Sequence, residues 1–335
     1  MWVKGGQIAR IADHFDPNAT IVLYEGDCLT LLGTIPEETV QLVVTSPPYN
    51  IGKEYEEKSS LSAYYQSQKR VIEECYRVLK PEGSICWQVG NYVDNGEILP
   101  LDIFLYPIFQ ELNLQLRNRI IWHYGHGLHA TKRFSGRYET ILWFTKTDDY
   151  YFNVDPIRVP QKYPEKKYFK GEKRGELSCN PLGKNPTDVW DIPNVKANHI
   201  EKTIHPAQFP VELIERLVLS MTKEGDWVLD PFCGSGTTQI ASMIHQRKAI
   251  GAEIEKKYVE IARSRIMAAE KGELRIRPME RPIYDPSAKT PSIHPKIVHT
   301  GKSNKTVPLS PIDLNRQFKN NSVIETSLRF AKSIR

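Results

Sequence analysis

The chain has 335 residues, of which 40% are hydrophobic and 25% charged, and a formal net charge of +5. This composition is typical of a globular protein with one large α/β domain and an accessory region. No stretch approaches the roughly 20 apolar residues that span a bilayer, and the first residues lack the apolar run of a signal peptide, so we expect a cytoplasmic protein without a membrane segment. The five cysteines are scattered without a C-x-x-C pair, which argues against a disulfide framework and a structural zinc site.

The first 149 residues alternate between β-prone and helical patterns. Helices are expected at 29–32, at about 62–79 and at about 101–111. The segment 80–83, which contains a proline and a glycine, is expected to end the second helix. The strands expected in this part are, in chain order, 21–24, 40–44, 84–89, about 116–123 and about 140–146.

The periodicity fails between about 150 and 200, where proline and lysine accumulate. Residues 158–184 carry eight Lys or Arg against three acidic residues, a local excess of +5 that equals the excess of the whole chain. Aromatic residues are interleaved with these charges, as expected where phosphates are neutralised and bases are stacked upon. We therefore predict an inserted recognition region, although the charge by itself is equally typical of a solvated loop.

A second alternating segment follows the irregular region. Pro210 suits the first turn of a helix whose apolar stripe includes Val211 and Val218. Strands are expected at about 227–230 and 248–253, each followed by a helix. This alternation of strands and helices implies a doubly wound, mostly parallel sheet with helices on both faces.

The segment around Gly234 has the features of a nucleotide-binding turn. A strand ends in Asp230, and Gly234 and Gly236 lead into the next helix, where the lack of a Cβ lets the backbone approach a ligand closely. About twenty residues later, Glu253 ends the next strand, where a carboxylate can accept hydrogen bonds from both hydroxyls of a ribose. Gln239 stands where the third glycine of a dinucleotide fingerprint would be, so the pattern favours an adenosine-bearing cofactor other than NAD.

Two motifs together resemble those of a known family. The run Asp230-Pro231-Phe232-Cys233-Gly234-Ser235-Gly236-Thr237-Thr238 resembles the S-adenosylmethionine-binding motif of DNA amino-methyltransferases, and Thr45-Ser46-Pro47-Pro48-Tyr49 resembles their catalytic motif. The catalytic motif comes first, as in the β group of this circularly permuted family. The resemblance covers about 21–267 and implies a seven-stranded, Rossmann-like methyltransferase sheet.

The resemblance, together with the spacing above, implies a set of cofactor-binding residues. They are Asp27, Thr45, His205, Phe209, Asp230, Phe232, Gly234, Gly236, Thr237 and Glu253. In the family, the position of Asp27 faces the adenine, and the segment 205–210 closes the methionine end of the pocket. Two alternatives stay open, because Asp27 also suits the cap of the helix that follows and Glu253 also suits the surface.

The catalytic residues that the resemblance implies are Ser46, Pro47, Pro48 and Tyr49. They follow an apolar strand, at the edge of the sheet where ligands bind in open α/β folds. The two prolines fix φ and remove two N–H donors, which leaves a rigid loop that presents carbonyl oxygens. By resemblance, the Ser46 side chain and the Pro47 carbonyl accept hydrogen bonds from an exocyclic amino group, while Tyr49 stacks on a base flipped out of the duplex. Neither a metal nor a covalent enzyme intermediate is expected.

Ser46 also bears on which base is methylated. Family members with serine at this position usually modify N4 of cytosine, whereas aspartate is usual in N6-adenine enzymes, so we predict a cytosine-N4-specific enzyme. Asn50 is frequent at its position among the adenine enzymes, and N6 of adenine therefore remains the alternative. Cytosine-C5 enzymes use a Pro-Cys pair, which this chain lacks. An RNA or protein amide methyltransferase, which usually has asparagine before Pro-Pro-Tyr, and a catalytically silent DNA-binding module are the remaining alternatives.

Basic residues in two segments are expected to contact double-stranded DNA. His123, His126 and His129 lie in or beside a glycine-rich loop at 124–138, but their spacing does not match a helical metal-binding pair. We expect this loop to lie against DNA beside the active site. The predicted DNA-binding residues are Lys132, Arg133, Arg137, Lys162, Lys166, Lys167, Lys170, Lys173 and Arg174.

The predicted organisation has four parts. They are a catalytic half at 1–149, a target-recognition insertion at 150–200, a cofactor-binding half at 201–272 and a basic C-terminal extension at 273–335. The expected protein is a site-specific DNA methyltransferase that uses S-adenosylmethionine. It would be either the modification half of a restriction system, with a cognate endonuclease as partner, or an orphan enzyme.

Overall fold

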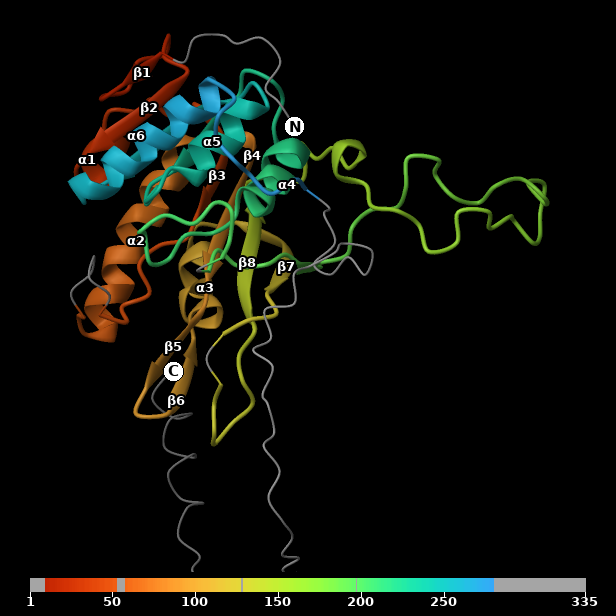
Figure 1. Ribbon diagram of the computed structural model, residues 1–335, viewed down its shortest axis with the longest axis horizontal. Helices are drawn as coiled ribbons and strands as arrows, with labels where there is room; N and C mark the ends of the chain where they lie inside the picture. Colours follow the sequence, from red (N-terminus) through yellow and green to blue (C-terminus); the bar gives the residue numbers. More distant parts are fainter. Residues whose placement is uncertain (1–9, 53–57, 128, 197, 280–335) are drawn as a thin grey trace, which may run out of the picture. The chain divides into compact units, whose positions relative to one another are not determined.

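A nine-stranded mixed sheet forms the centre of the fold (Figure 1) in the computed structural model, which describes residues 10–52, 58–127, 129–196 and 198–279. The strand order is β1-β2-β11-β10-β3-β4-β8-β7-β9. These strands are β1 (Ile11–Ala12), β2 (Ile21–Glu25), β3 (Val40–Thr45), β4 (Leu79–Val89), β7 (Gln115–His123), β8 (Tyr138–Thr145), β9 (Val189–Asp191), β10 (Trp227–Asp230) and β11 (Lys248–Glu253). Seven of them are the predicted strands, and the short strands β1 and β9 extend the two edges.

Most neighbouring strands of this sheet are parallel. All pairs from β1 to β4 in the spatial order are parallel, and β9 is parallel to β7. β8 is antiparallel to both of its neighbours, β4 and β7, and is thus the one reversed strand among those described. The mostly parallel, doubly wound sheet is therefore confirmed.

Helices cover both faces of the sheet (Figure 1). They are α1 (Cys28–Leu32), α2 (Leu61–Val78), α3 (Leu101–Glu111), α4 (Val211–Met221), α5 (Thr237–Ile244) and α6 (Lys256–Glu270). The first three helices bury apolar side chains in one cluster and the last three in another. Strand residues alternate between the clusters, so that Leu229 faces the first and Val228 the second, as the two-residue period of a strand requires.

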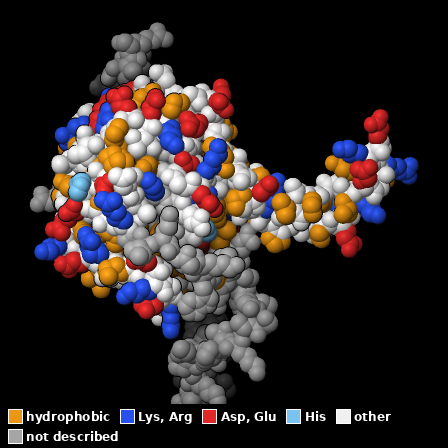
Figure 2. Space-filling model, turned by 90° about the horizontal axis from the view of Figure 1, so that it is seen from above, with side chains coloured by type: hydrophobic (Ala, Val, Ile, Leu, Met, Phe, Trp, Pro, Cys, Tyr) orange, Lys and Arg blue, Asp and Glu red, His pale blue; other side chains and the backbone are white. Residues whose placement is uncertain are grey.

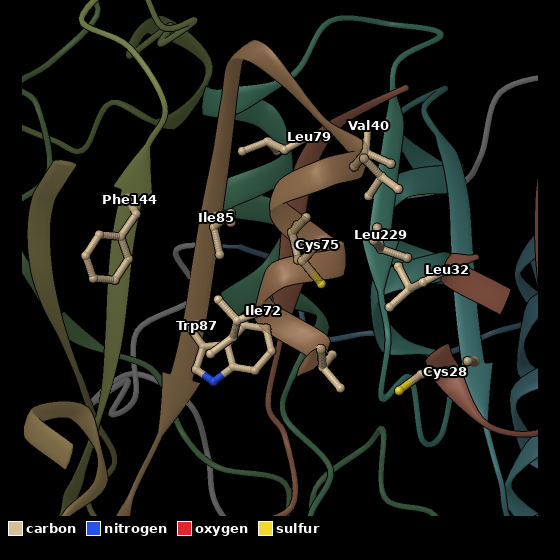
Figure 3. Close-up of a cluster of buried hydrophobic side chains, with 14 of the residues drawn as sticks. Cys28, Leu32, Val40, Ile72, Cys75, Leu79, Ile85, Trp87, Phe144 and Leu229 are labelled. Carbon is tan, nitrogen blue, oxygen red and sulfur yellow. The ribbon is translucent and has the colours of Figure 1, made fainter. Parts of the chain in front are cut away.

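The packing of α2 on the sheet shows why this helix forms where it does (Figure 3). Ile72 and Cys75 are fully buried on one face of the helix, beside Ile85 and Trp87 of β4. Burying an aliphatic or aromatic side chain of this size stabilises a fold by about 1.5–3 kcal/mol. The helix begins at the cap residue Ser60, whose hydroxyl accepts a hydrogen bond from the Ala63 amide.

Two local features differ from the sequence-based prediction. Residues 80–83 do not separate helix from strand, because α2 ends at Val78 and β4 begins at the next residue. Gly83 lies so close to β3 that a Cβ there would be 2.9 Å from the Gln41 carbonyl oxygen, which explains the glycine. A hairpin of β5 (Asn91–Asp94) and β6 (Glu97–Pro100), with Asn95 and Gly96 in left-handed conformation at its turn, was not predicted.

The irregular region contains little regular structure, as predicted. Its described elements are the short helix η1 (Asp155–Ile157) and β9. Between them, residues 158–184, here called the arm, run out and back as two antiparallel segments joined by the isolated bridges Val159↔Lys184 and Lys167↔Leu177. All residues from 162 to 177 are exposed. The described residues fall within one compact unit, Met1–Asp285, and residues 280–335 of the predicted extension lie outside the described residues.

Candidate functional site

Two neighbouring parallel strands, β3 and β10, end side by side at the carboxyl edge of the sheet. The chain continues from β3 to a helix on one face and from β10 to a helix on the other, so this is the switch point at which doubly wound folds bind ligands. The Thr45 hydroxyl donates a 2.6 Å hydrogen bond to Oδ1 of Asp230, although the two residues are 185 positions apart. The two sequence motifs are therefore joined directly.

Asp230 is the centre of this junction. Its side chain is completely buried and also accepts hydrogen bonds from the Thr238 hydroxyl, at 2.6 Å, and from the Phe232 amide, at 3.2 Å. Burial raises the pKa of Asp230 from 3.8 to about 6, against the opposing effect of these donors. Asp230 thus fixes the turn after β10 to the start of the predicted catalytic loop, and it does so from within the core.

The predicted glycine turn follows β10. Gly234 and Gly236 have φ values of 49° and 75°, in the left-handed region that glycine adopts without strain. From α6, the buried Arg265 donates hydrogen bonds to the Ser235 carbonyl, at 2.6 Å, and to the Thr237 hydroxyl, at 3.1 Å. This arginine holds the turn from behind, and sequence reasoning missed it because an arginine within an amphipathic helix carries no distinguishing signal.

Glu253 lies at the end of β11, next to the glycine turn. Its carboxylate accepts hydrogen bonds from the Gly234 amide, at 3.0 Å, and from the Glu255 amide, at 2.8 Å. Burial raises the pKa of this carboxyl group. Each carboxylate oxygen has a second lone pair, so these contacts position Glu253 and leave acceptor capacity for a ligand.

Several other predicted cofactor residues gather around the same turn. The His205 ring lies directly over Gly234, where a Cβ would be 2.9 Å from His205 Nε2, and packs edge-on against Tyr258 with centroids 4.3 Å apart. The Phe209 carbonyl accepts a 3.4 Å hydrogen bond from the Thr237 hydroxyl. Phe232 is partly buried and lies edge-on to Trp87.

Asp27 caps a helix, which was one of the two alternatives for this residue. Its carboxylate accepts hydrogen bonds from the Leu29 amide, at 2.9 Å, and the Thr30 amide, at 3.3 Å, so it caps α1. The residue nevertheless follows β2, and the Gly26 amide donates to the Glu253 carbonyl at 2.9 Å. Asp27 therefore stands at the same sheet edge as Glu253, already engaged as a helix cap.

The predicted catalytic loop follows β3 at this edge. Pro47 is buried, whereas Ser46, Pro48 and Tyr49 are partly exposed. The Ser46 hydroxyl is 3.0 Å from the Tyr49 hydroxyl, and the Tyr49 ring lies against the backbone of Gly90, where a Cβ would be 3.0 Å from Tyr49 Cε2. After the loop, the Asn50 side chain binds the backbone of Ser59 through two hydrogen bonds of 2.7 and 2.8 Å, which ties the loop's end to the start of α2.

Three polar residues that sequence reasoning missed form a hydrogen-bonded cluster with the Tyr49 hydroxyl. Tyr49 donates a 3.0 Å hydrogen bond to Glu139 Oε2, and Gln88 Nε2 donates to the Tyr49 oxygen at 3.0 Å and also to Glu139. The Tyr124 hydroxyl donates to the other Glu139 oxygen at 3.5 Å. Burial raises the pKa of Glu139, and burial followed by the Glu139 charge raises the pKa of Tyr49. A glutamate at the start of an otherwise apolar strand was the available signal.

The predicted DNA-binding residues lie on two separate segments. Lys132 and Arg133 are exposed in the loop between β7 and β8, whereas Arg137 is partly buried and donates to the Gly136 carbonyl at 2.8 Å. The other six, Lys162, Lys166, Lys167, Lys170, Lys173 and Arg174, are exposed on the arm. Figure 2 shows basic and acidic side chains interspersed on the arm.

His123 and His129 have polar side-chain partners other than a metal, and His129 Nδ1 is 3.5 Å from Arg137 Nη2. His123 Nδ1 is 2.6 Å from Asp191 Oδ1, across the β7–β9 pair. Within the described ranges, no three His, Cys, Asp or Glu side chains come together as a metal site would require. Among the helices of the described part, none combines the length and the apolar character needed to cross a bilayer.

Known proteins share both this sequence and this fold. The model of a DNA methylase family, the N6/N4 methyltransferases, matches residues 40–264. The type II methyltransferase M.BglII of Bacillus subtilis is 58% identical over 72% of this chain and 67% of its own length. The DNA adenine methyltransferase YhdJ of Escherichia coli is 34% identical over 75% of this chain and 84% of its own length.

Solved structures agree with the sequence comparison. The cytosine-N4-specific PvuII DNA methyltransferase has a TM-score of 0.60 and 22% identity over 76% of this chain and 93% of its own, which shows the shared fold. A Thermus thermophilus protein complexed with S-adenosyl-L-methionine has a TM-score of 0.53 and 30% identity over 74% of this chain and 93% of its own. The chain therefore belongs to the N6/N4 DNA methylase family, whose members are amino-methyltransferases that use S-adenosylmethionine.

Proposed function

We propose that the chain methylates N4 of cytosine at a specific sequence in double-stranded DNA. The observation that carries this choice of base is Ser46, a neutral hydroxyl where the adenine enzymes of the family usually have a carboxylate. Its oxygen lies 3.0 Å from the Tyr49 hydroxyl and is partly exposed, so it is available to a base. Relatives at 58% and 39% identity are type II methyltransferases, M.BglII and M.ScaI of Streptomyces caespitosus, which supports a role in a restriction-modification system with a cognate endonuclease.

N6 of adenine is the second candidate. The observation in its favour is the 34% identity to a DNA adenine methyltransferase over three quarters of this chain. Both reactions transfer a methyl group to an exocyclic amino group, and the described contacts of the loop suit either one. Identification of the methylated nucleoside separates them.

The residues at the switch point fit S-adenosylmethionine. Gly234 and Gly236 form a turn in which added Cβ atoms would meet His205 and Ala262 at 2.9 and 2.8 Å, so only glycine lets these neighbours pack closely against the turn. Glu253 would accept hydrogen bonds from the ribose, and the His205 segment would close the methionine end of the pocket. When bound, the cofactor supplies an electrophilic methyl group on a sulfonium.

The chain's own contribution to the reaction is positioning and hydrogen bonding. An exocyclic amino group is a poor nucleophile because its lone pair is delocalised into the ring. The Ser46 oxygen and the Pro47 carbonyl would accept its two hydrogens and favour a pyramidal nitrogen that faces the methyl group. Tyr49, held by Gly90 and by Glu139, would stack on the flipped base. The rigid proline pair keeps these groups in place.

The test of the proposed function is identification of the product. Purified protein is incubated with methyl-labelled S-adenosylmethionine and unmethylated genomic DNA, and the DNA is digested to nucleosides. Labelled N4-methylcytosine is the expected product. Labelled N6-methyladenine would replace the proposal by the second candidate, and label in RNA or protein with none in DNA would overturn both.

Replacing Gly234 by alanine is expected to weaken S-adenosylmethionine binding at least about tenfold. The strain at φ 49° and the contact with His205 should displace the turn in the free protein, and restoring its geometry on binding should cost about 1.4 kcal/mol or more. Calorimetric titration with S-adenosylhomocysteine measures the affinity. Gly225→Ala is the matched control, because Gly225 also has positive φ, 84°, but no atom within 4 Å of the added Cβ. Equal affinities of the two variants would contradict this assignment of the turn.

Removing three positive charges from the arm is expected to weaken DNA binding. In the triple alanine variant of Lys166, Lys167 and Lys170, each lost phosphate contact lowers the slope of log K against log salt by about 0.9. We expect the affinity at physiological salt to fall at least about tenfold. Fluorescence anisotropy with a labelled duplex at several salt concentrations measures both quantities.

The control for the arm variant removes the same number of positive charges elsewhere. Its substitutions to alanine are at three exposed basic residues on and after α6, Lys256, Arg263 and Lys271. Its salt slope should stay within error of the unmodified protein. An equal loss of slope in both variants would show a diffuse charge effect and remove the arm from DNA binding.

A further inference from the structure

Glu139 is a partly buried carboxyl group that the mechanism above does not consume. It is on β8, the reversed strand, whose first residues lie at the same sheet edge as the end of β4. The hydrogen bond from Tyr49 to Glu139 is 3.0 Å, and the distance from the Tyr49 hydroxyl to the Ser46 hydroxyl is also 3.0 Å. A continuous chain of three oxygen-bearing groups thus runs from the catalytic serine to this carboxylate.

The hydrogen bonds of this chain have a definite direction. Because Tyr49 donates its only hydroxyl proton to Glu139, its oxygen is left as an acceptor, and Gln88 Nε2 donates to it at 3.0 Å. The Ser46 hydroxyl, the other group within reach, must then also donate to Tyr49. The remaining lone pairs of Ser46 are turned away from Tyr49, where they can accept a hydrogen from an amino group.

We propose that Glu139 is the terminal acceptor for the proton that the amino group loses during methylation, reached through Ser46 and Tyr49. Because it concerns the same reaction, this relay rests on the proposed function. Glu139 acts through other residues and is thus a positioning and proton-accepting residue. It also orients both hydroxyl groups before the substrate arrives.

The proton transfer balances along the chain. Formation of the N–C bond to the methyl group leaves the nitrogen with a positive charge and one hydrogen too many. The N–H bond breaks as that proton bonds to the Ser46 oxygen, the Ser46 proton moves to the Tyr49 oxygen, and the Tyr49 proton moves to Glu139. The nitrogen becomes neutral and the Glu139 carboxyl group is protonated, and release of this proton to water restores the carboxylate.

The surroundings of Glu139 support its role as an acceptor. The groups that face it are Tyr49 of the catalytic loop, Gln88 of β4, Tyr124 after β7 and, at longer range, the positive charge of Lys196. Burial raises the pKa of Glu139 above 4.5, against the opposing effect of these neighbours. A carboxylate with a raised pKa holds a proton more readily than one in water.

The first experiment replaces Glu139 by glutamine, which keeps an oxygen that can accept from Tyr49 but cannot take up a proton. Single-turnover transfer of label to unmethylated DNA is measured from about pH 5 to 8, since general base groups titrate within such a window. The unmodified protein should show a rate that rises with pH as Glu139 ionises. Glu139→Gln should be at least about tenfold slower at the upper end and lose this rise, with unchanged affinity for S-adenosylhomocysteine. A variant that keeps the rise would overturn the relay.

A second variant keeps the test decisive if Glu139→Gln does not fold. Tyr49→Phe removes the middle hydroxyl and should produce a similar loss of rate and of the pH-dependent rise. In the double variant the two losses should not add, because both break one chain, and additive losses would count against the relay. Glu97→Gln, at an exposed position on β6, is the matched control and should behave as the unmodified protein.

Failure of the relay and failure of the proposed function give different results. If the unmodified protein transfers no label to DNA, the proposed function is wrong. If it methylates either base and the Glu139→Gln and Tyr49→Phe profiles keep their pH-dependent rise, only the relay is wrong.

Discussion

Replacing Ser46 by alanine should lower the single-turnover rate of methyl transfer by about 100-fold, the usual effect of removing one hydrogen-bonding group that is aimed at a developing charge. Ser46 is partly exposed, and in the proposed mechanism its oxygen lies next to the base. Alanine can neither accept a hydrogen from the amino group nor continue the chain to Tyr49. Rapid-quench measurements with labelled cofactor and saturating DNA give the rate directly.

Cofactor binding should be spared in this variant, because Ser46 makes no described contact with Asp230 or the glycine turn. The affinity for S-adenosylhomocysteine should therefore stay within about twofold of the unmodified protein, well below the tenfold that corresponds to 1.4 kcal/mol. Ser264→Ala, at an exposed position of α6, is the matched control. A Ser46→Ala rate equal to that of the control would remove the serine from catalysis.

Replacing Asp230 by asparagine should stabilise the protein at pH 8. The pKa of Asp230 is about 6 in the folded chain and 3.8 as an ordinary carboxyl group, so between these values the unfolded chain loses a proton that the folded chain keeps. The free energy of unfolding therefore falls as the pH rises through this window, by about 3 kcal/mol once the pH exceeds 6. Asparagine resembles the protonated acid and does not ionise, so the variant avoids this loss.

The difference between Asp230→Asn and the unmodified protein should be largest near pH 8 and vanish near pH 4. Urea unfolding at several pH values measures it, and a constant difference would contradict the raised pKa as its cause. Asp148→Asn, an exposed carboxylate paired with Arg117 at 2.7 Å, controls for the loss of one negative charge. If Asp230→Asn is more stable than the unmodified protein, the native carboxylate lowers the free energy of unfolding. Its presence would then be explained by its function at the switch point.

The sheet and the cofactor turn could be predicted because their sequence signals are local. The apolar strand that ends in Asp230, and the glycines that follow it, allow few backbone conformations, and the structure has the predicted ones. Sequence periodicity also separated the helices correctly, apart from the junction of α2 with β4. At that junction Leu79 pairs directly with Val40, and the register then shifts so that Ser84 pairs with Leu42.

The surroundings of Tyr49 could not be predicted because they depend on strand order. Glu139 and Gln88 are 51 positions apart, and they meet because β8 is antiparallel to β4 with Gln88 opposite Ile141. A sequence that alternates strand and helix favours parallel neighbours, and nothing in the run 138–145 indicates a reversed strand. Asp27 is a different case, since the same local pattern suits a helix cap and a ligand contact.

The arm closes on itself where it leaves the domain. Val159 and Lys184 exchange two backbone hydrogen bonds of 3.0 and 2.9 Å, and Arg158 donates to the Gly183 carbonyl at 3.1 Å. Because these hydrogen bonds join the two ends of the arm, residues between the ends can be inserted, deleted or replaced without disturbing the sheet. The entropic cost of closing a longer loop rises only slowly with its length. If the arm binds DNA as proposed, its residues can change the recognised sequence while the residues at the strand ends stay the same.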